Sequence, residues 1–195
     1  MNATHDPQVY FHIRIVMGMI FGLAVTRILS GFAVFVQHPK GAGIAPLHLG
    51  WAAYILINAV FFWWWEYALA SIPVWTFALY IFLILYTSVF YIICVLLFPD
   101  DLGEYRDYGD YLIGRRKWFF GIFGLSQVLD QIDTWIKGVD YALSLGVLSM
   151  VQTALVVAGC LIAMFTTNRR YHGIFLGLLL TSQMLWIVWL TGATP

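Results

Sequence analysis

Four polar side chains share one face of an otherwise apolar segment, residues 118–141. Ser126, Asp130, Asp133 and Lys137 follow one another at steps of four, three and four, so a helix carries them as one stripe. An ionisable group that faces lipid is costly, and such groups in membrane helices face protein or a water-filled cavity. We therefore expect this stripe to lie inside a helix bundle, where it can line a path for a proton or a small solute.

Two ion pairs are expected from depth and spacing. Arg14 and Glu66 lie at a similar depth in two neighbouring antiparallel apolar segments, which predicts a salt bridge near the outer interface. His12 lies close enough to join this pair and to titrate near neutral pH. Asp133 and Lys137 are one helical turn apart and can pair within their own helix.

A third pair is expected nearer the middle of the bilayer. Arg27 can reach Asp130, with Asn58 and Gln127 supplying hydrogen bonds at the same level. Such groups have two interpretations, a polar path and a structural clasp that only fixes the register of the helices. A stripe of small residues typical of close helix packing favours the clasp and predicts that this face of the first span meets protein; its members are Gly18, Gly22, Thr26 and Ser30.

The composition is that of an integral membrane protein. The 195-residue chain is 62% hydrophobic and only 10% charged, whereas soluble domains are about half apolar and a quarter charged. The formal net charge of +0 argues against nucleic acid as a partner. The two cysteines, Cys94 and Cys160, lie in apolar runs, so neither a disulfide framework nor a zinc site is predicted.

Runs of about 20 apolar residues predict an all-α bundle of six transmembrane helices in one domain. The spans are about 9–36, 47–70, 73–98, 118–139, 142–165 and 173–191, and a solvated loop is expected between the third and the fourth. Proline and glycine mark the joins, as at Pro39, Pro73 and Pro99. With six helices there is little room for a wide pore, so a homo-oligomer or a larger membrane complex is compatible with this interpretation.

The basic residues predict the orientation. Eight of the ten lie on one side, namely Arg27, Lys40, Arg106, Arg115, Arg116, Lys117, Arg169 and Arg170. The positive-inside rule puts this side in the cytoplasm and both termini outside it. Arg115, Arg116 and Lys117 are expected to anchor the chain to lipid headgroups. Tryptophans near both ends of the spans, Trp51 and Trp118 among them, agree with an aromatic belt at each interface.

Motifs for catalysis or cofactor binding are weak. His48 and His172 are the only candidates for axial haem ligands, but a haem protein would place such a pair deep between facing helices. We found no phosphate-binding glycine loop, HExxH, GxSxG or CxxC motif. The sequence therefore predicts no cofactor and no metal, and it favours a protein that is not an enzyme.

Several strings of residues resemble those of a family of small, uncharacterised bacterial integral membrane proteins. They are the TRILSG string from Thr26, HLGWA from His48, the triplet of tryptophans from Trp63, and RRKWFFG from Arg115. The resemblance covers about the first two thirds of the chain and implies a bacterial inner membrane as the setting. It carries no activity to transfer, and it marks Arg27 and His48 as positions of interest.

Together these patterns predict a small transport or channel-like protein for an ion, a proton or a polar solute. The alternative is a non-catalytic structural or sensory subunit of a membrane complex, whose charges only hold the helices together. A membrane enzyme or a haem-binding protein comes third.

Overall fold

The chain folds as a bundle of long helices. The computed structural model describes residues 7–37 and 45–193, and within these ranges it contains helices and no strand. The long helices are α1 (Pro7–Gln37), α2 (Pro46–Trp65), α3 (Phe77–Leu97), α5 (Arg116–Ile136), α7 (Gly146–Phe165) and α8 (Arg169–Ala193). Shorter helices lie between them: η1 (Glu66–Ser71), α4 (Tyr108–Gly114) and α6 (Val139–Ser144).

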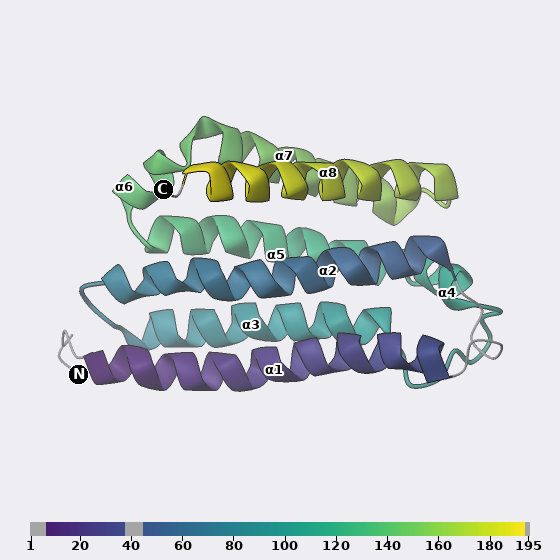
Figure 1. Cartoon of the computed structure of the whole chain (residues 1–195), viewed down its shortest axis with the longest axis horizontal. Coiled ribbons are helices and arrows are strands. Elements are labelled where there is room, and N and C mark those ends of the chain that lie inside the picture. Colours follow the sequence, from purple (N-terminus) through teal and green to yellow (C-terminus); the bar gives the residue numbers. More distant parts are fainter. Residues whose placement is uncertain (1–6, 38–44, 194–195) are drawn as a thin grey trace.

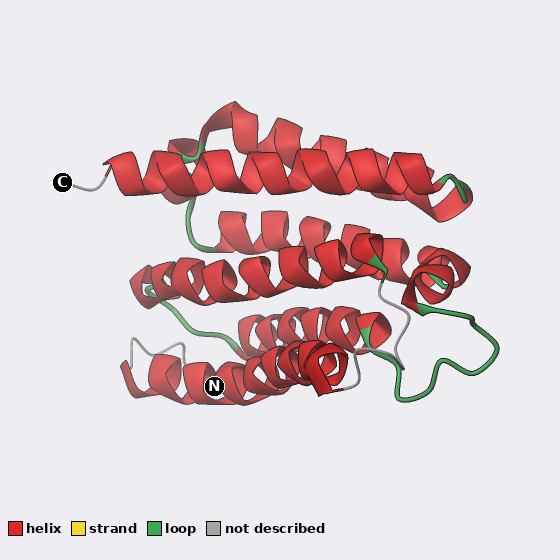
Figure 2. Cartoon of the chain, turned by 45° about the vertical axis from the view of Figure 1, so that its right-hand side comes forward, coloured by secondary structure: helices red, strands yellow, loops and turns green. Residues whose placement is uncertain are grey.

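The long helices alternate in direction along a common axis (Figures 1 and 2). Helix α1 begins and α8 ends at the same end of the bundle, which we call the terminal end. The opposite end, the loop end, contains α4 and the connections after α3 and α7. This arrangement agrees with the prediction that both termini lie on the same side of the bundle. Lys40, one of the residues used to predict the orientation, lies outside the described residues.

Within residues 7–37 and 45–193, five stretches are long and apolar enough to cross a membrane: Gln8–Gln37, Pro46–Ser71, Phe77–Leu97, Gly146–Phe165 and Arg169–Val188. Helix α5 has the same length as α3, but it is less apolar and is not in this group. Its outward face is nevertheless apolar, because Leu125, Val128, Ile132 and Trp135 are all exposed. Ser126 and Asp133 are buried on the opposite face, where α5 packs against α3 and α7. This pattern, polar inside and apolar outside, suits a helix that has one face against protein and the other against lipid.

The first helix buries a different face from the one that the small-residue stripe predicted. Ile13, Met17, Phe21 and Ile28 are buried, and α1 packs mainly against α3. Gly22, Thr26 and Ser30 are exposed instead. The larger apolar side chains occupy the contact between α1 and α3, because each of them buries more apolar surface than glycine, threonine or serine does.

Two predicted spans end differently in the structure. The second span leaves the α-helix at Trp65 and continues as η1, a tighter 3₁₀ helix. The predicted fifth span, 142–165, is divided into α6 and α7. Gly146 adopts a positive φ of 72° at this break, a backbone conformation that glycine accepts without strain.

The segment expected to be a solvated loop contains a short helix, α4. Asp107 caps it, because the Asp107 carboxylate accepts a hydrogen bond from the backbone N–H of Asp110 at 2.9 Å. Tyr108 and Tyr111 are buried on the inner side of α4. The expectation of a solvated loop was therefore wrong for this part, since aromatic side chains fix it to the bundle.

Candidate functional site

Three charged side chains form a buried group near the terminal end, which we call the charge cluster: Glu66, Asp133 and Lys137. The Lys137 Nζ lies 2.9 Å from Oε1 of Glu66 and 2.5 Å from Oδ2 of Asp133. All three side chains are less than a tenth exposed. The predicted pair of Asp133 and Lys137 is therefore confirmed, and Glu66 joins it from η1.

The predicted salt bridge between Arg14 and Glu66 is not formed. Arg14 lies over the rings of Tyr10 and Trp63, with its guanidinium carbon 5.4 and 5.7 Å from the ring centroids. These are cation–π distances. The prediction was wrong because the two residues share a depth but not a direction, since Glu66 points toward α5. His12 is exposed and is not part of this group.

Asp130 has a neutral partner instead of Arg27. The Tyr86 hydroxyl donates a hydrogen bond of 2.8 Å to Oδ1 of Asp130. Arg27 donates to the carbonyl of Phe98 at 2.5 Å and to Oδ1 of Asp100 at 2.6 Å. The predicted pair of Arg27 and Asp130 fails because Arg27 lies in the loop-end half of α1, whereas Asp130 lies in the terminal-end half of α5.

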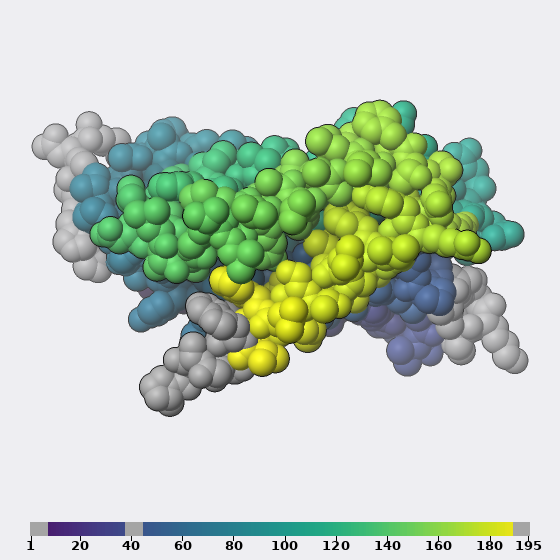
Figure 3. Space-filling model, turned by 90° about the horizontal axis from the view of Figure 1, so that it is seen from above, coloured from purple at the N-terminus to yellow at the C-terminus, as the bar shows by residue number. Residues whose placement is uncertain are grey.

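A cavity of about 620 Å³ lies beside Asp130. It reaches from the middle of the bundle, at Tyr54 and Phe123, to the terminal end, at Trp65 and Trp186. Seen from above, α7 and α8 lie close together near the loop end and diverge toward the terminal end (Figure 3). The predicted Asn58 and Gln127 also line this cavity, as does Lys137 of the charge cluster.

Hydrogen bonds between neighbouring helices hold the polar wall of the cavity. Thr153 donates to Oε1 of Gln131 at 3.3 Å, which links α7 to α5. Gln152 donates to the Ser182 hydroxyl at 3.0 Å, which links α7 to α8. Asn58 donates to the carbonyl of Tyr54 at 2.9 Å within α2.

Among the described residues, two amide nitrogens of the cavity wall have no hydrogen-bond acceptor. Gln183 is buried, and its Nε2 donates to no group. The Nε2 of Gln131 is buried and unpartnered as well. The predicted site residues did not include Gln131, Gln152 and Gln183, although polar side chains in such apolar spans are a signal that could have identified them.

Aromatic side chains fill the half of the bundle that is nearer the loop end. Trp51 is fully buried, and its indole ring lies 5.1–5.6 Å, between ring centroids, from Phe119, Phe120 and Phe123. Phe175 of α8 completes the contact at 5.8 Å. We call these five residues the aromatic plug. Trp51 was expected at the membrane interface, but its ring instead fills the space between α2, α5 and α8.

Both candidate haem ligands bind backbone carbonyl groups of the loop end. His48 Nε2 donates to Leu97 O at 2.6 Å, and His172 Nε2 donates to Thr166 O at 3.0 Å. His48 packs against Phe98, whereas His172 stacks on Phe120. In this arrangement each histidine fixes the end of a helix. Among residues 7–37 and 45–193, no group of three His, Cys, Asp or Glu side chains lies close enough to hold a metal ion.

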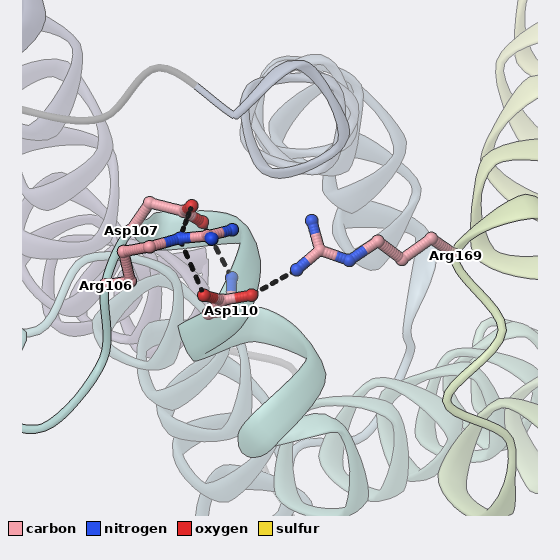
Figure 4. A network of polar contacts seen from close by, with 4 residues as sticks. All are labelled: Arg106, Asp107, Asp110 and Arg169. Atoms are coloured by element: carbon pink, nitrogen blue, oxygen red, sulfur yellow. Dashed lines mark hydrogen bonds and ion pairs between the residues drawn. The ribbon is translucent and has the colours of Figure 1, made fainter.

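A network of ion pairs joins α4 to α8 at the loop end (Figure 4). Arg106 Nε lies 3.3 Å from a carboxylate oxygen of Asp107 and 3.3 Å from one of Asp110. Asp110 also accepts from Arg169, at the start of α8. The network lies at the surface of the loop end, since the side chains of Arg106 and Arg169 are largely exposed.

The three residues expected to anchor the chain to lipid lie at the start of α5. Arg115 and Lys117 are exposed. Arg116 donates to the carbonyl of Ile113 at 2.9 Å, and Arg115 lies over the ring of Tyr105. Contact of these side chains with headgroups stays a prediction.

Comparison of the chain with protein-family models, with curated proteins and with solved structures found no match. The function is therefore inferred from the geometry of the site.

Proposed function

We propose that this protein is a small membrane carrier that moves a proton, a small cation or a cationic polar solute through the cavity beside Asp130. The single observation that carries the proposal is the cavity itself, which is lined by a carboxylate and by polar side chains in the middle of an apolar bundle. Ionisable groups at such a depth are costly and mark ion and solute pathways.

A carrier fits the geometry better than an open channel does. The cavity reaches the terminal end, whereas the buried rings of the aromatic plug fill the bundle between the cavity and the loop end. A solute that enters from the terminal end can leave at the loop end only when the rings around Trp51 separate. Alternation between two such states is the basis of carrier transport.

The proposed setting is a bacterial inner membrane, which α5 crosses as the sixth spanning helix. The proposal that α5 spans the membrane is supported by its apolar outward face and its place within the bundle. The basic residues at the loop end, Arg106, Arg115, Arg116, Lys117, Arg169 and Arg170, support a cytoplasmic location for that end. The cavity then opens to the outside of the cell.

Currents from proteoliposomes on a solid-supported membrane test the proposal. Concentration jumps of protons, potassium, sodium and organic ammonium salts should give a current with at least one of them, above protein-free liposomes. Asp130→Asn should reduce that current at least tenfold, because it removes the fixed negative charge. Asp140→Asn is the matched control, since Asp140 is exposed and does not line the cavity. Equal currents from the Asp130→Asn variant and the wild type, or no current from the wild type, would contradict transport.

One observation favours the second candidate, a structural or sensory subunit. The Lys137 ammonium is already shared between Glu66 and Asp133, as in a clasp that fixes the positions of η1 and α5. A protein of this kind would give no current with any of the four jumps, yet Lys137→Met would still destabilise it.

A further inference from the structure

The charges around the cavity do not balance among the described residues. Lys137 contacts the carboxylates of Glu66 and Asp133, so two anions already share one cation. Among the described residues, Asp130 forms no ion pair, and its hydrogen-bond partner is the neutral hydroxyl of Tyr86. A carboxylate in such an apolar setting favours a cation from outside the chain, because its charged form is costly there without a counter-charge.

The remaining lining suits an organic cation better than a metal ion. Mg²⁺ and Ca²⁺ require six or more oxygen ligands in a defined geometry. The described residues bring together no group of three metal-ligating side chains. Aromatic rings are plentiful instead, among them Tyr54, Phe62, Tyr86 and Phe123. Faces of such rings attract ammonium groups.

The buried amides require a second feature in the ligand. Gln183 is 7% exposed, lines the cavity, and has an Nε2 that donates to no group. The Nε2 of Gln131, on the same side of α5 as the cavity, is also without an acceptor. A buried donor without a partner costs free energy, which a ligand with an acceptor oxygen recovers.

We infer that the cavity binds an organic ammonium ion that also carries a hydrogen-bond acceptor, with Asp130 facing the ammonium group and Gln183 donating to the acceptor. The cavity volume of about 620 Å³ is within the range of sites for organic ligands. This inference rests on the proposed function for its site, and it adds the chemical class of the solute.

Isothermal titration calorimetry with the full chain in detergent tests the inference through three matched probes. Tyramine has an ammonium group and a phenol hydroxyl, tyrosol replaces the ammonium by a neutral hydroxyl, and phenethylamine lacks the phenol hydroxyl. We expect tyramine to bind at least tenfold more tightly than tyrosol, and also more tightly than phenethylamine. Equal affinities for tyramine and tyrosol, or no binding of either amine, would overturn the inference.

Two variants assign the contacts. Asp130→Asn should weaken the binding of tyramine and of phenethylamine by a similar factor, roughly tenfold to a hundredfold, as expected for a hydrogen bond to a charged group. Gln183→Met should weaken tyramine and leave phenethylamine unchanged, because only tyramine offers the acceptor. A Gln183→Met variant that weakens both amines equally would contradict the assignment of Gln183. Asp140→Asn serves again as the control.

The two proposals fail separately. Amine binding without any current would overturn transport and keep the ligand class. A current carried by protons or potassium, sensitive to Asp130→Asn and without amine binding, would overturn the ligand class and keep transport.

Discussion

The Nζ of Lys137 lies 2.9 Å from Oε1 of Glu66, although 71 positions separate the two residues in the chain. This contact connects the end of α5 to η1, and Asp133 completes it from one turn away on α5. One ammonium thus stabilises two buried carboxylates, and the loss of the ammonium would leave both without a counter-charge.

Lys137→Met should therefore destabilise the protein strongly. Removing one partner of a buried ion pair typically costs about 3–5 kcal/mol, because the remaining charge stays buried. Unfolding in mixed micelles, followed by circular dichroism, would measure the change in the free energy of unfolding. Lys117→Met is the matched control, since Lys117 is exposed, and it should change this free energy by less than about 0.5 kcal/mol.

Removing the stranded anions as well should restore stability. Combining Lys137→Met with Glu66→Gln and Asp133→Asn replaces the charge cluster by neutral groups of similar size, which recovers much of the loss. If Lys137→Met alone unfolds like the wild type, water reaches the cluster and the carboxylates are not stranded.

A double-mutant cycle should couple Asp130 to Tyr86 and not to Arg27. Tyr86→Phe and Asp130→Asn remove the two ends of one hydrogen bond, so their effects on the free energy of unfolding should deviate from additivity by about 0.5–3 kcal/mol. Arg27→Gln and Asp130→Asn touch separate networks, and their effects should add to within about 0.5 kcal/mol. Strong coupling of Arg27 to Asp130 would show that these two helices are shifted relative to the structure.

The helices and the polar stripe of α5 could be predicted from the sequence, because hydropathy and helical spacing are local properties of the chain. Five apolar spans and the up-and-down order follow from them. The interior position of Asp133 and Lys137 was predictable too. The opposite face of α5 carries apolar side chains such as Leu125 and Ile132, which can face lipid, so the charged face has to point into the bundle.

Which side chains form ion pairs between helices could not be predicted from their depth alone. Arg14 and Glu66 have the same depth, but a salt bridge also needs both side chains to face the same gap, and this depends on how each helix is rotated. Trp51 shows the same limit: its position near the end of a span suggested the interface, whereas its rotation puts it within the aromatic plug.

Acid should loosen the segment before α4 through Asp107. The backbone N–H of Asp110 donates to this carboxylate and lowers the pKa of Asp107 below its usual value. The resulting stabilisation is complete above the unfolded pKa, about 4, and is lost as the pH falls through the lower folded pKa. Pepsin cleavage of the segment 99–107 should therefore accelerate as the pH falls below about 4.

Asp107→Asn provides the reference for that measurement. Asparagine is as good a helix cap as aspartate, but it does not titrate in this range. The ratio of cleavage rates between the wild type and this variant should rise with acid, which cancels the pH dependence of pepsin itself. A constant ratio would mean that protonation of Asp107 does not affect the end of α4.

Labelling of single cysteines should place the loop end in the cytoplasm. The native thiols offer little background, because Cys94 and Cys160 are buried. Asp140→Cys, exposed near the terminal end, should react with a membrane-impermeant maleimide added to intact cells. Glu104→Cys, exposed at the loop end, should react only after the cells are permeabilised, since the basic residues around it stay inside. The reverse labelling pattern would overturn the orientation and make the cavity open to the cytoplasm, while the order of the helices would stand.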